Sequence, residues 1–345
     1  MIFSDYLPLI CSIATTLGLY ASDIPQEIQE QKNRPKYGIG EHIYTATPDC
    51  TTLLARQFKP DIIATKTYIN TTKEPNYCKT LAYLNHKKQL KYDDLTKQVF
   101  VATEYLPVNT KHINIANAVG MPSPDMETIE RNIIQTMQLL QEHQPTTKLM
   151  VSIYGTSLKG FATMATLTKK LTVPYVCANL SCPNIENNSC YLYKDPIRVA
   201  AILKTIVPIL TTIPVVVKIG LFAPEELFLM EQVCQTIAQN GAYAIYGINA
   251  PQARVVNEDG SPTFGTDREY AGLSGTQIRS LTLDWAKKVR AIIDAYKLPL
   301  KLFVGGGITR QEDFALFESC KPDALFSVTG IMFNTIKFPT TVSKL

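Results

Sequence analysis

Short apolar runs rich in β-branched residues recur along the chain and constrain its fold more than any other feature. Each run is continuous, without alternation of polar and apolar residues. A strand that is buried on both faces needs such a run, and strands of this kind occur in parallel sheets covered by helices. The pattern therefore predicts an α/β fold. The runs are DIIAT (61–65), HINIAN (112–117), KLMVSIY (148–154), YVCANL (175–180), PVVVKI (214–219), AYAIYGIN (242–249), LKLFVGG (300–306) and ALFSVTG (324–330).

The segments between these runs have helical periodicity. METIERNIIQTMQLLQEH (126–143) and PEELFLMEQVCQTIAQNG (224–241) carry apolar residues at helical spacing, and the second ends in Asn-Gly, a helix stop. Eight strand–helix units predict a (β/α)8 TIM barrel, whose chemistry would lie where the strands end. GEHIYTA (40–46) is a ninth candidate strand, so one of the nine runs must lie outside the barrel.

Two connections are longer than a minimal barrel requires. They cover residues 66–111 and 250–280. Because long insertions after barrel strands commonly carry function, we expect them to form part of the site or an interface.

The first 38 residues are expected to form an N-terminal extension and linker, and residues 39–345 the barrel. Residues 6–21 are nearly uncharged and apolar, but they are short for a membrane span of about 20 residues and lack the basic start of a signal peptide. A helix docked on the body is the main expectation, with a membrane-associated or cleaved segment as the alternative. Residues 22–38 are polar and bounded by prolines, which indicates a linker or surface excursion.

Charge and cysteine content exclude several classes of protein. The 34 basic and 30 acidic residues give a net charge of +4 and are spread evenly, unlike a nucleic-acid-binding footprint. The eight cysteines form no CxxC pair, so neither a tetrathiolate zinc site nor a cysteine-ligated iron–sulfur cluster has its usual spacing. We expect a reduced, cytoplasmic protein without a metal.

Lysines and asparagines gather at the carboxyl ends of the predicted strands. A lysine there is costly to bury unless an anion meets it, and asparagines suit a planar ligand with alternating C=O and N–H groups. Taken singly, each lysine could be a rim residue and each asparagine a turn former. Their coincidence around one barrel mouth favours a ligand site. They are Lys66, Asn117, Asn179, Asn184, Lys218 and Asn249.

Glycine turns follow the last two predicted strands. One is GGGI (305–308), and the other is TGI (329–331). The corresponding loops of TIM barrels commonly bind phosphate through backbone N–H groups, although glycines also serve tight turns. A phosphate there, with lysines and asparagines deeper in the mouth, would suit a flavin mononucleotide (FMN) lying across the barrel.

The motif NLSCPN (179–184) carries the most specific resemblance to a known family. From about residue 40 to 335 the chain resembles the dihydroorotate dehydrogenases, cytosolic class 1 in particular, with the dihydropyrimidine dehydrogenases as close relatives. The class 1 enzymes carry their catalytic cysteine in this motif. Supporting matches are TK (65–66), NAVGMP (117–122), VVVK (215–218), the asparagine of GINA (247–250), YAGLSG (270–275) and GGGI (305–308).

The resemblance implies an FMN-dependent oxidation of dihydroorotate in pyrimidine biosynthesis. FMN would accept hydride at N5 while Cys182 takes the C5 proton as the base, and Thr65 and Ser181 would support by hydrogen bonds. Lys218 would face the N1–C2 carbonyl side of the flavin. Positions matching the substrate site are Lys66, Asn117, Val119, Gly120, Met121, Asn179, Asn184 and Asn249. Positions matching the FMN site are Ala46, Thr47, Lys66, Asn179, Lys218, Gly272, Ser274, Gly275, Gly305, Gly306, Gly307, Thr329 and Gly330.

The chain also departs from the family pattern. Ala250 replaces the usual serine or threonine after the last substrate asparagine, the flavin-contacting strand reads YTATP (44–48), and residues 185–193 differ from the class 1A pattern. Two alternatives therefore stay open: reduction of another dihydropyrimidine or pyrimidine, and a drifted barrel with a binding or regulatory role. The electron acceptor is open between fumarate, a quinone and a partner flavoprotein, and class 1 relatives lead us to expect a homodimer.

Overall fold

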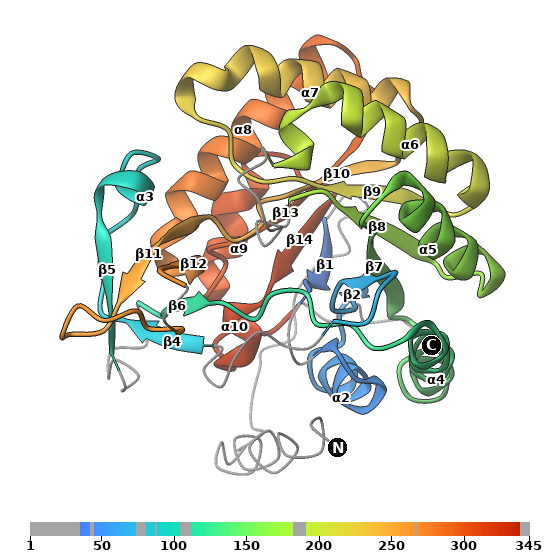
Figure 1. The fold of residues 1–345 in the computed structure, drawn as a ribbon, viewed down its shortest axis with the longest axis horizontal. Helices are drawn as coiled ribbons and strands as arrows, with labels where there is room; N and C mark the ends of the chain where they lie inside the picture. The colour runs from blue at the N-terminus through green and yellow to red at the C-terminus, as the bar shows by residue number, and fades with distance from the viewer. Residues whose placement is uncertain are drawn as a thin grey trace, which may run out of the picture. The chain divides into compact units, whose positions relative to one another are not determined.

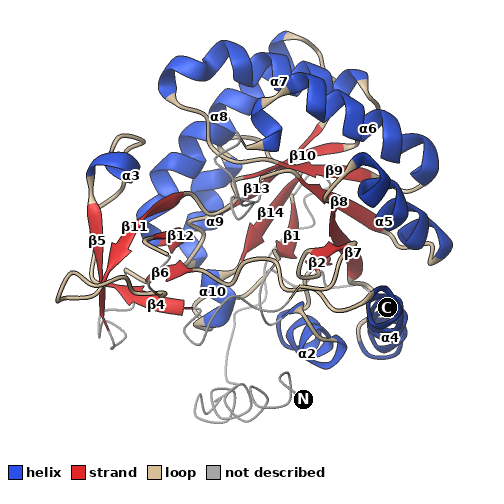
Figure 2. Ribbon diagram, viewed as in Figure 1, coloured by secondary structure: helices blue, strands red, loops and turns tan. Residues whose placement is uncertain are grey.

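The described part of the chain is built around a closed barrel of parallel strands. The computed structural model describes residues 35–41, 45–73, 81–86, 88–103, 112–181, 191–265 and 268–338. Eight strands follow one another around the barrel in chain order, and β2 pairs with β7 to close it. They are β1 (Lys36–Ile39), β2 (Ile62–Ala64), β7 (Lys148–Tyr154), β8 (Tyr175–Asn179), β9 (Val215–Lys218), β10 (Ala244–Gly247), β13 (Lys301–Gly305) and β14 (Ala324–Ser327). The predicted (β/α)8 barrel is confirmed (Figures 1 and 2).

Helices cover the outside of the barrel (Figure 2). Both segments with helical periodicity form helices, α4 (Met126–His143) and α7 (Leu227–Gln239). Asp125 caps α4, because its side chain accepts a hydrogen bond from the Thr128 N–H at 2.8 Å. The other helices are α2 (Pro48–Phe58), α3 (Asp94–Lys97), α5 (Leu158–Lys170), α6 (Pro196–Leu210), α8 (Arg279–Ala295), α9 (Gln311–Glu318) and α10 (Thr329–Met332), with 3₁₀ helices η3 (Leu192–Lys194), η4 (Pro224–Glu226) and η5 (Thr276–Ile278).

A second, smaller sheet is built mainly from the two long connections. Its strands pair in the order β11, β12, β6, β4, β5 and close on themselves, since β11 also pairs with β5. They are β4 (Leu81–Leu84), β5 (Val99–Thr103), β6 (Asn114–Asn117), β11 (Gln252–Val256) and β12 (Tyr270–Gly275). The short β3 (Tyr68–Ile69) instead extends the main sheet beside β7. The connections thus carry a structural unit of their own, labelled at one side of the barrel in Figure 1.

The structure identifies the surplus run among the nine candidate strands. β6, within HINIAN, belongs to the small sheet, where it pairs antiparallel with β4 and β12. The first barrel strand is instead Lys36–Ile39, which precedes the predicted run 40–46 and begins inside the predicted linker 22–38. This strand lacks a long apolar run because Gly38 leaves space for the Phe326 ring: a Cβ atom there would lie 2.4 Å from a ring carbon. Residues 42–44 lie outside the described part.

Small and aromatic side chains fill the interior of the barrel. The rings of Tyr246 and Phe326 lie 4.8 Å apart between centroids, and those of Phe303 and Phe326 lie 5.6 Å apart. The inner cluster comprises Ile62, Ala64, Met150, Cys177, Val216, Ala244, Tyr246, Phe303, Ala324 and Phe326. Because this part of the barrel is packed, chemistry is left to its mouth.

None of the helices among the described residues is long and apolar enough to cross a membrane. This part of the chain also contains no group of three or more His, Cys, Asp or Glu side chains that could hold a metal ion.

Candidate functional site

A cavity opens at the carboxyl ends of the barrel strands. Leu81 and Ile115 of the small sheet line it together with Asn179 and Lys218 of the barrel. The long connections therefore contribute to the cavity wall, as predicted. The predicted site residues that line this cavity are Lys66, Asn117, Val119, Gly120, Met121, Asn179, Lys218, Asn249, Gly272, Ser274, Gly275, Gly305, Gly306, Gly307 and Thr329.

Three predicted cofactor residues are not among the lining residues: Ala46, Thr47 and Gly330. Thr47 caps α2, where its hydroxyl accepts a hydrogen bond from the Cys50 N–H at 3.4 Å. Gly330 belongs to α10, and a Cβ atom there would lie 2.8 Å from the Ser327 hydroxyl. Ala46 and Thr47 were expected at the end of a strand over 40–46, whereas β1 ends at Ile39, so both residues lie beyond that strand.

The predicted base Cys182 and the predicted substrate residue Asn184 lie outside the described residues. The described segment 112–181 ends at Ser181, which two asparagines contact through hydrogen bonds. Asn179 accepts hydrogen bonds from the Ser181 N–H at 3.3 Å and hydroxyl at 3.1 Å. Asn249 donates to the Ser181 carbonyl at 2.9 Å. The ends of β8 and β10 thus fix the backbone directly before Cys182.

Lys66, two residues after β2, contacts the loop after β6, while Asn117 joins two strands of the small sheet. The Lys66 ammonium donates to the Gly120 carbonyl at 3.0 Å, and the Asn117 amide donates to the Gly272 carbonyl at 3.1 Å. Gly120 has φ 72°, a left-handed conformation that favours glycine. The predicted substrate loop is therefore tied to Lys66, which was itself predicted to belong to the substrate site.

Glu41 was missed by the sequence reasoning, and it lies in the same cavity as Lys218. Its carboxylate is 2.6 Å from the Lys218 ammonium, and the two side chains are only 4% and 8% exposed. The ammonium also lies 5.2 Å from the centroid of the Tyr246 ring. The sequence predicts a strand over 40–46, which puts Glu41 near the start of that strand and away from the mouth of the barrel. The sequence signal that could have identified Glu41 is an acidic residue directly after the glycine-containing segment 38–40.

Further hydrogen bonds surround Glu41. Its second oxygen accepts from the Ser152 hydroxyl at 3.2 Å and the Cys177 thiol at 3.5 Å. Burial opposes its charge, but the Lys218 ammonium holds the pKa of Glu41 below its ordinary value. Burial and the Glu41 charge raise the pKa of the Cys177 thiol well above its usual range. Cys177 is therefore a protonated donor, unsuited to act as a base.

A chain of hydroxyl groups connects Glu41 with Asn179. The Ser152 and Thr67 hydroxyls lie 2.9 Å apart, and Thr67 accepts a hydrogen bond from the Asn179 amide at 3.0 Å. The Thr65 hydroxyl accepts from the Ser152 N–H at 3.1 Å. The carboxylate and the substrate asparagine therefore belong to one buried polar network.

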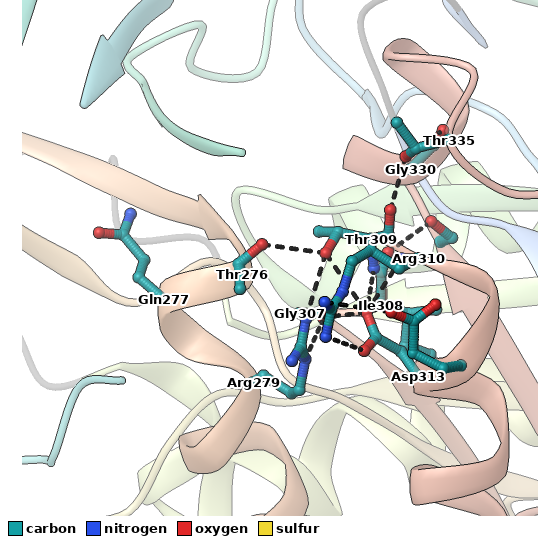
Figure 3. Close-up of polar contacts among 12 residues, drawn as sticks. Thr276, Gln277, Arg279, Gly307, Ile308, Thr309, Arg310, Asp313, Gly330 and Thr335 are labelled. Carbon is teal, nitrogen blue, oxygen red and sulfur yellow. Dashed lines mark hydrogen bonds and ion pairs between the residues drawn. The ribbon is translucent and has the colours of Figure 1, made fainter. Parts of the chain in front are cut away.

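The glycine turn after β13 is held from behind by a second ion pair. Arg279 donates to the Gly307 carbonyl at 3.2 Å and pairs with Asp313 at 3.0 Å. Asp313 also accepts from the Thr309 N–H at 2.8 Å and the Arg310 N–H at 3.0 Å. Figure 3 shows these groups converging on the Asp313 carboxylate. The pair fixes the loop without itself lining the cavity.

This turn leaves its backbone open toward the cavity. Gly306 has φ 119° and Gly307 has φ 76°, and a Cβ atom at Gly307 would lie 2.4 Å from the Arg279 Cα. Only glycine satisfies both the conformation and the close approach. A turn of this kind can present backbone N–H groups to an anion.

Ala250, Gln252 and Tyr270 also line the cavity. Ala250 lies against Gly272, since a Cβ atom at Gly272 would be 3.0 Å from the Ala250 Cβ and 3.2 Å from the Asn117 amide nitrogen. The departure from the family pattern at Ala250 thus lies within the site.

Comparison with known proteins connects the site to one family. A family model described as dihydroorotate dehydrogenase matches residues 106–344. The chain is 31% identical over 242 residues to the dihydroorotate dehydrogenase of Dictyostelium discoideum, covering 68% of this chain and 64% of that protein. It is 26% identical over 253 residues to the catalytic subunit of dihydroorotate dehydrogenase B (NAD(+)) of Caldicellulosiruptor bescii, covering 68% of this chain and 77% of that subunit.

A solved structure shares the fold. The crystal structure of a DHODH from Eimeria tenella in complex with ferulenol matches 87% of this chain and 77% of its own, with a TM-score of 0.65 and 13% sequence identity. At this identity the likeness shows the fold alone.

Proposed function

Because the chain belongs to the dihydroorotate dehydrogenase family, a family of flavin oxidoreductases, we propose that it oxidises dihydroorotate to orotate with FMN as cofactor. One observation carries the proposal: asparagines, two lysines and a glycine turn that are far apart in the sequence line one cavity. A drifted barrel with a binding role would have no need to keep this set together.

The donor set of the cavity fits FMN. The turn Gly305–Gly307 lines the cavity and would hold the phosphate through its backbone N–H groups. Lys218, which is buried and also lines the cavity, would hold the polar edge of the flavin ring. When bound, FMN supplies a hydride acceptor at N5.

The substrate has amide edges and a carboxylate, and the remaining lining residues complement both. Asn117, Asn179 and Asn249 offer amide donors and acceptors to the pyrimidine ring. The backbone at Val119–Met121, with the Lys66 ammonium beside it, would meet the carboxylate. Binding through several fixed groups orients the C5 and C6 atoms for reaction.

Cys182 is the proposed base for the C5 proton, as in the class 1 enzymes that the chain resembles. The support is local: Asn179 and Asn249 both hold Ser181, the residue before it. A free thiol titrates near about 8.5, so proton removal should become faster toward alkaline pH. We also propose a homodimer. The electron acceptor stays open between fumarate, a quinone and a partner flavoprotein.

Ala250 favours a second candidate, another dihydropyrimidine. A hydroxyl at this position would pair with a polar group of the ligand, and its loss leaves that group unpaired at a cost of about 1–3 kcal/mol. A substrate that lacks that polar group would bind without this penalty.

The test is to purify the protein, add FMN, remove free flavin and mix anaerobically with dihydroorotate. Bleaching of the bound flavin, with orotate formed in equal amount, is the expected result. A protein that binds no FMN would overturn both candidates. A yellow protein that dihydroorotate leaves oxidised, but that another dihydropyrimidine bleaches, would select the second.

A further inference from the structure

Glu41 is a buried carboxylate in the cavity to which the proposed reaction gives no role. It lies two residues after the end of β1, and the intervening Gly40 lets the backbone approach the barrel interior: a Cβ atom there would lie 2.8 Å from the Tyr246 hydroxyl. Its oxygens meet the Lys218 ammonium, the Ser152 hydroxyl and the Cys177 thiol. Burial and the Glu41 charge raise the pKa of the Tyr246 hydroxyl, which is therefore neutral.

The ion pair between Glu41 and Lys218 reduces the net positive charge of the cavity. Among the described lining residues, the charged side chains are Glu41, Lys66 and Lys218. Lys66 donates to the Gly120 carbonyl, whereas Lys218 is 2.6 Å from a full negative charge. In a water-poor interior that charge is little screened, so it cancels most of the field that Lys218 would otherwise project.

Stability alone gives little reason for such a pair. Desolvating two charges offsets most of their attraction, so well-packed apolar side chains of similar volume would often serve as well or better. A buried pair that lines a cavity is better explained by the ligand it faces.

On the premise of the proposed function, we propose that Glu41 is a positioning residue that lowers the redox potential of bound FMN by neutralising Lys218. Two-electron reduction at N5 leaves negative charge on the flavin ring, which an unpaired ammonium stabilises. Glu41 removes much of that stabilisation. The flavin then takes hydride from substrate with less driving force and passes electrons to its acceptor with more.

The test compares midpoint potentials of FMN bound to the full chain, measured against a reference dye. In Glu41→Gln the ratio of reduced to oxidised flavin at a fixed potential should rise at least tenfold, which for a two-electron couple is about 30 mV. Glu41→Asp keeps the charge and should stay near wild type. Glu226→Gln is the matched control, because Glu226 pairs with Lys194 at 2.5 Å outside the cavity lining.

Two further variants separate charge from packing. Lys218→Gln removes the cation beside Glu41, so at alkaline pH, where the carboxylate stays ionised, the potential should fall below that of wild type at the same pH. The double variant E41Q/K218Q keeps the net charge of the wild type, and its potential should return toward the wild-type value. The difference between Lys218→Gln and the double variant reports the Glu41 charge even if Glu41→Gln alone does not fold.

The outcomes distinguish the two proposals. A wild-type protein that binds no FMN removes the proposed function and this inference with it. FMN binding with equal potentials in wild type and Glu41→Gln, or with equal shifts in Glu41→Gln and Glu41→Asp, overturns the role of Glu41 alone. Equal potentials in Lys218→Gln and the double variant would do the same.

Discussion

Two buried ion pairs flank the cavity, and they differ in what they face. Arg279 and Asp313 lie behind the glycine turn, 12% and 2% exposed, and hold backbone groups. Lys218 and Glu41 are equally buried, but both line the cavity. The same interaction therefore shapes a loop in one place and sets the electrostatics of a ligand site in the other. Burial alone does not tell the two apart.

The largest expected effect comes from removing the proposed base, Cys182. Cys182→Ala should retain FMN and its visible spectrum, while the rate of flavin reduction by dihydroorotate falls by about 10²–10⁴-fold. Stopped-flow absorbance measures it, and Cys320→Ala, outside the cavity lining, is the control. An undiminished rate in Cys182→Ala would mean that the proton leaves by another route.

Breaking the Arg279–Asp313 pair should lower the free energy of unfolding. Asp313→Ala leaves Arg279 buried without its carboxylate and strips the Thr309 and Arg310 N–H groups of their acceptor. We expect the free energy of unfolding to fall by about 3–5 kcal/mol, measured by urea denaturation.

The control for that experiment is Asp284→Ala, which breaks an exposed pair with Lys288 on α8. It should cost less than about 1 kcal/mol. Losses of similar size in Asp313→Ala and Asp284→Ala would contradict the role of Asp313 in holding the turn.

The Glu41–Lys218 pair should stabilise the folded apoprotein at pH values above the ordinary pKa of a glutamate. The folded state lowers the pKa of Glu41, so the unfolded state binds more protons near the ordinary value of about 4.3. The contribution is therefore complete above that value and is lost as pH falls through the folded-state pKa. Urea midpoints of the apoprotein should fall more steeply with acidification in wild type than in Glu41→Gln. Parallel curves would show that Glu41 is not ionised in the folded protein.

The smallest effect is expected at Ala250, in the lining of the cavity. Ala250→Ser restores a hydroxyl in the cavity lining and should strengthen orotate binding by about 1 kcal/mol, roughly fivefold. Titration of the bound flavin's spectrum with orotate measures it. Ala46→Ser, outside the cavity lining, should leave the affinity unchanged. Weaker binding in Ala250→Ser would favour a substrate without the matching polar group.

The barrel was predictable from the sequence where its strands are continuous apolar runs. β7 and β9 are buried almost throughout, and their apolar runs alone were enough to predict them as barrel strands. β6 carries the same signal, since Ile115 and Ala116 are buried in the small sheet, so the pattern alone could not exclude it from the barrel. β1 gave too weak a signal, because its four residues include Lys36 and Gly38.

The site was predictable where family motifs follow well-placed strands, as at Lys66, Lys218 and Asn249. Near β1 the strand was expected over 40–46 but ends at Ile39; Glu41 lines the cavity there, and Ala46 and Thr47 do not. The pairing of Glu41 with Lys218 joins residues 177 positions apart, which no local pattern reports.

The central claim is that the Arg279–Asp313 pair holds the glycine turn, whereas the Glu41–Lys218 pair sets the redox potential of bound FMN. It is tested most directly by the midpoint potential of FMN bound to Asp313→Asn, measured at saturating FMN beside wild type and Glu41→Gln. The account predicts a wild-type potential in Asp313→Asn and a raised potential in Glu41→Gln. Equal shifts in the two variants, or a shift in Asp313→Asn alone, would contradict it.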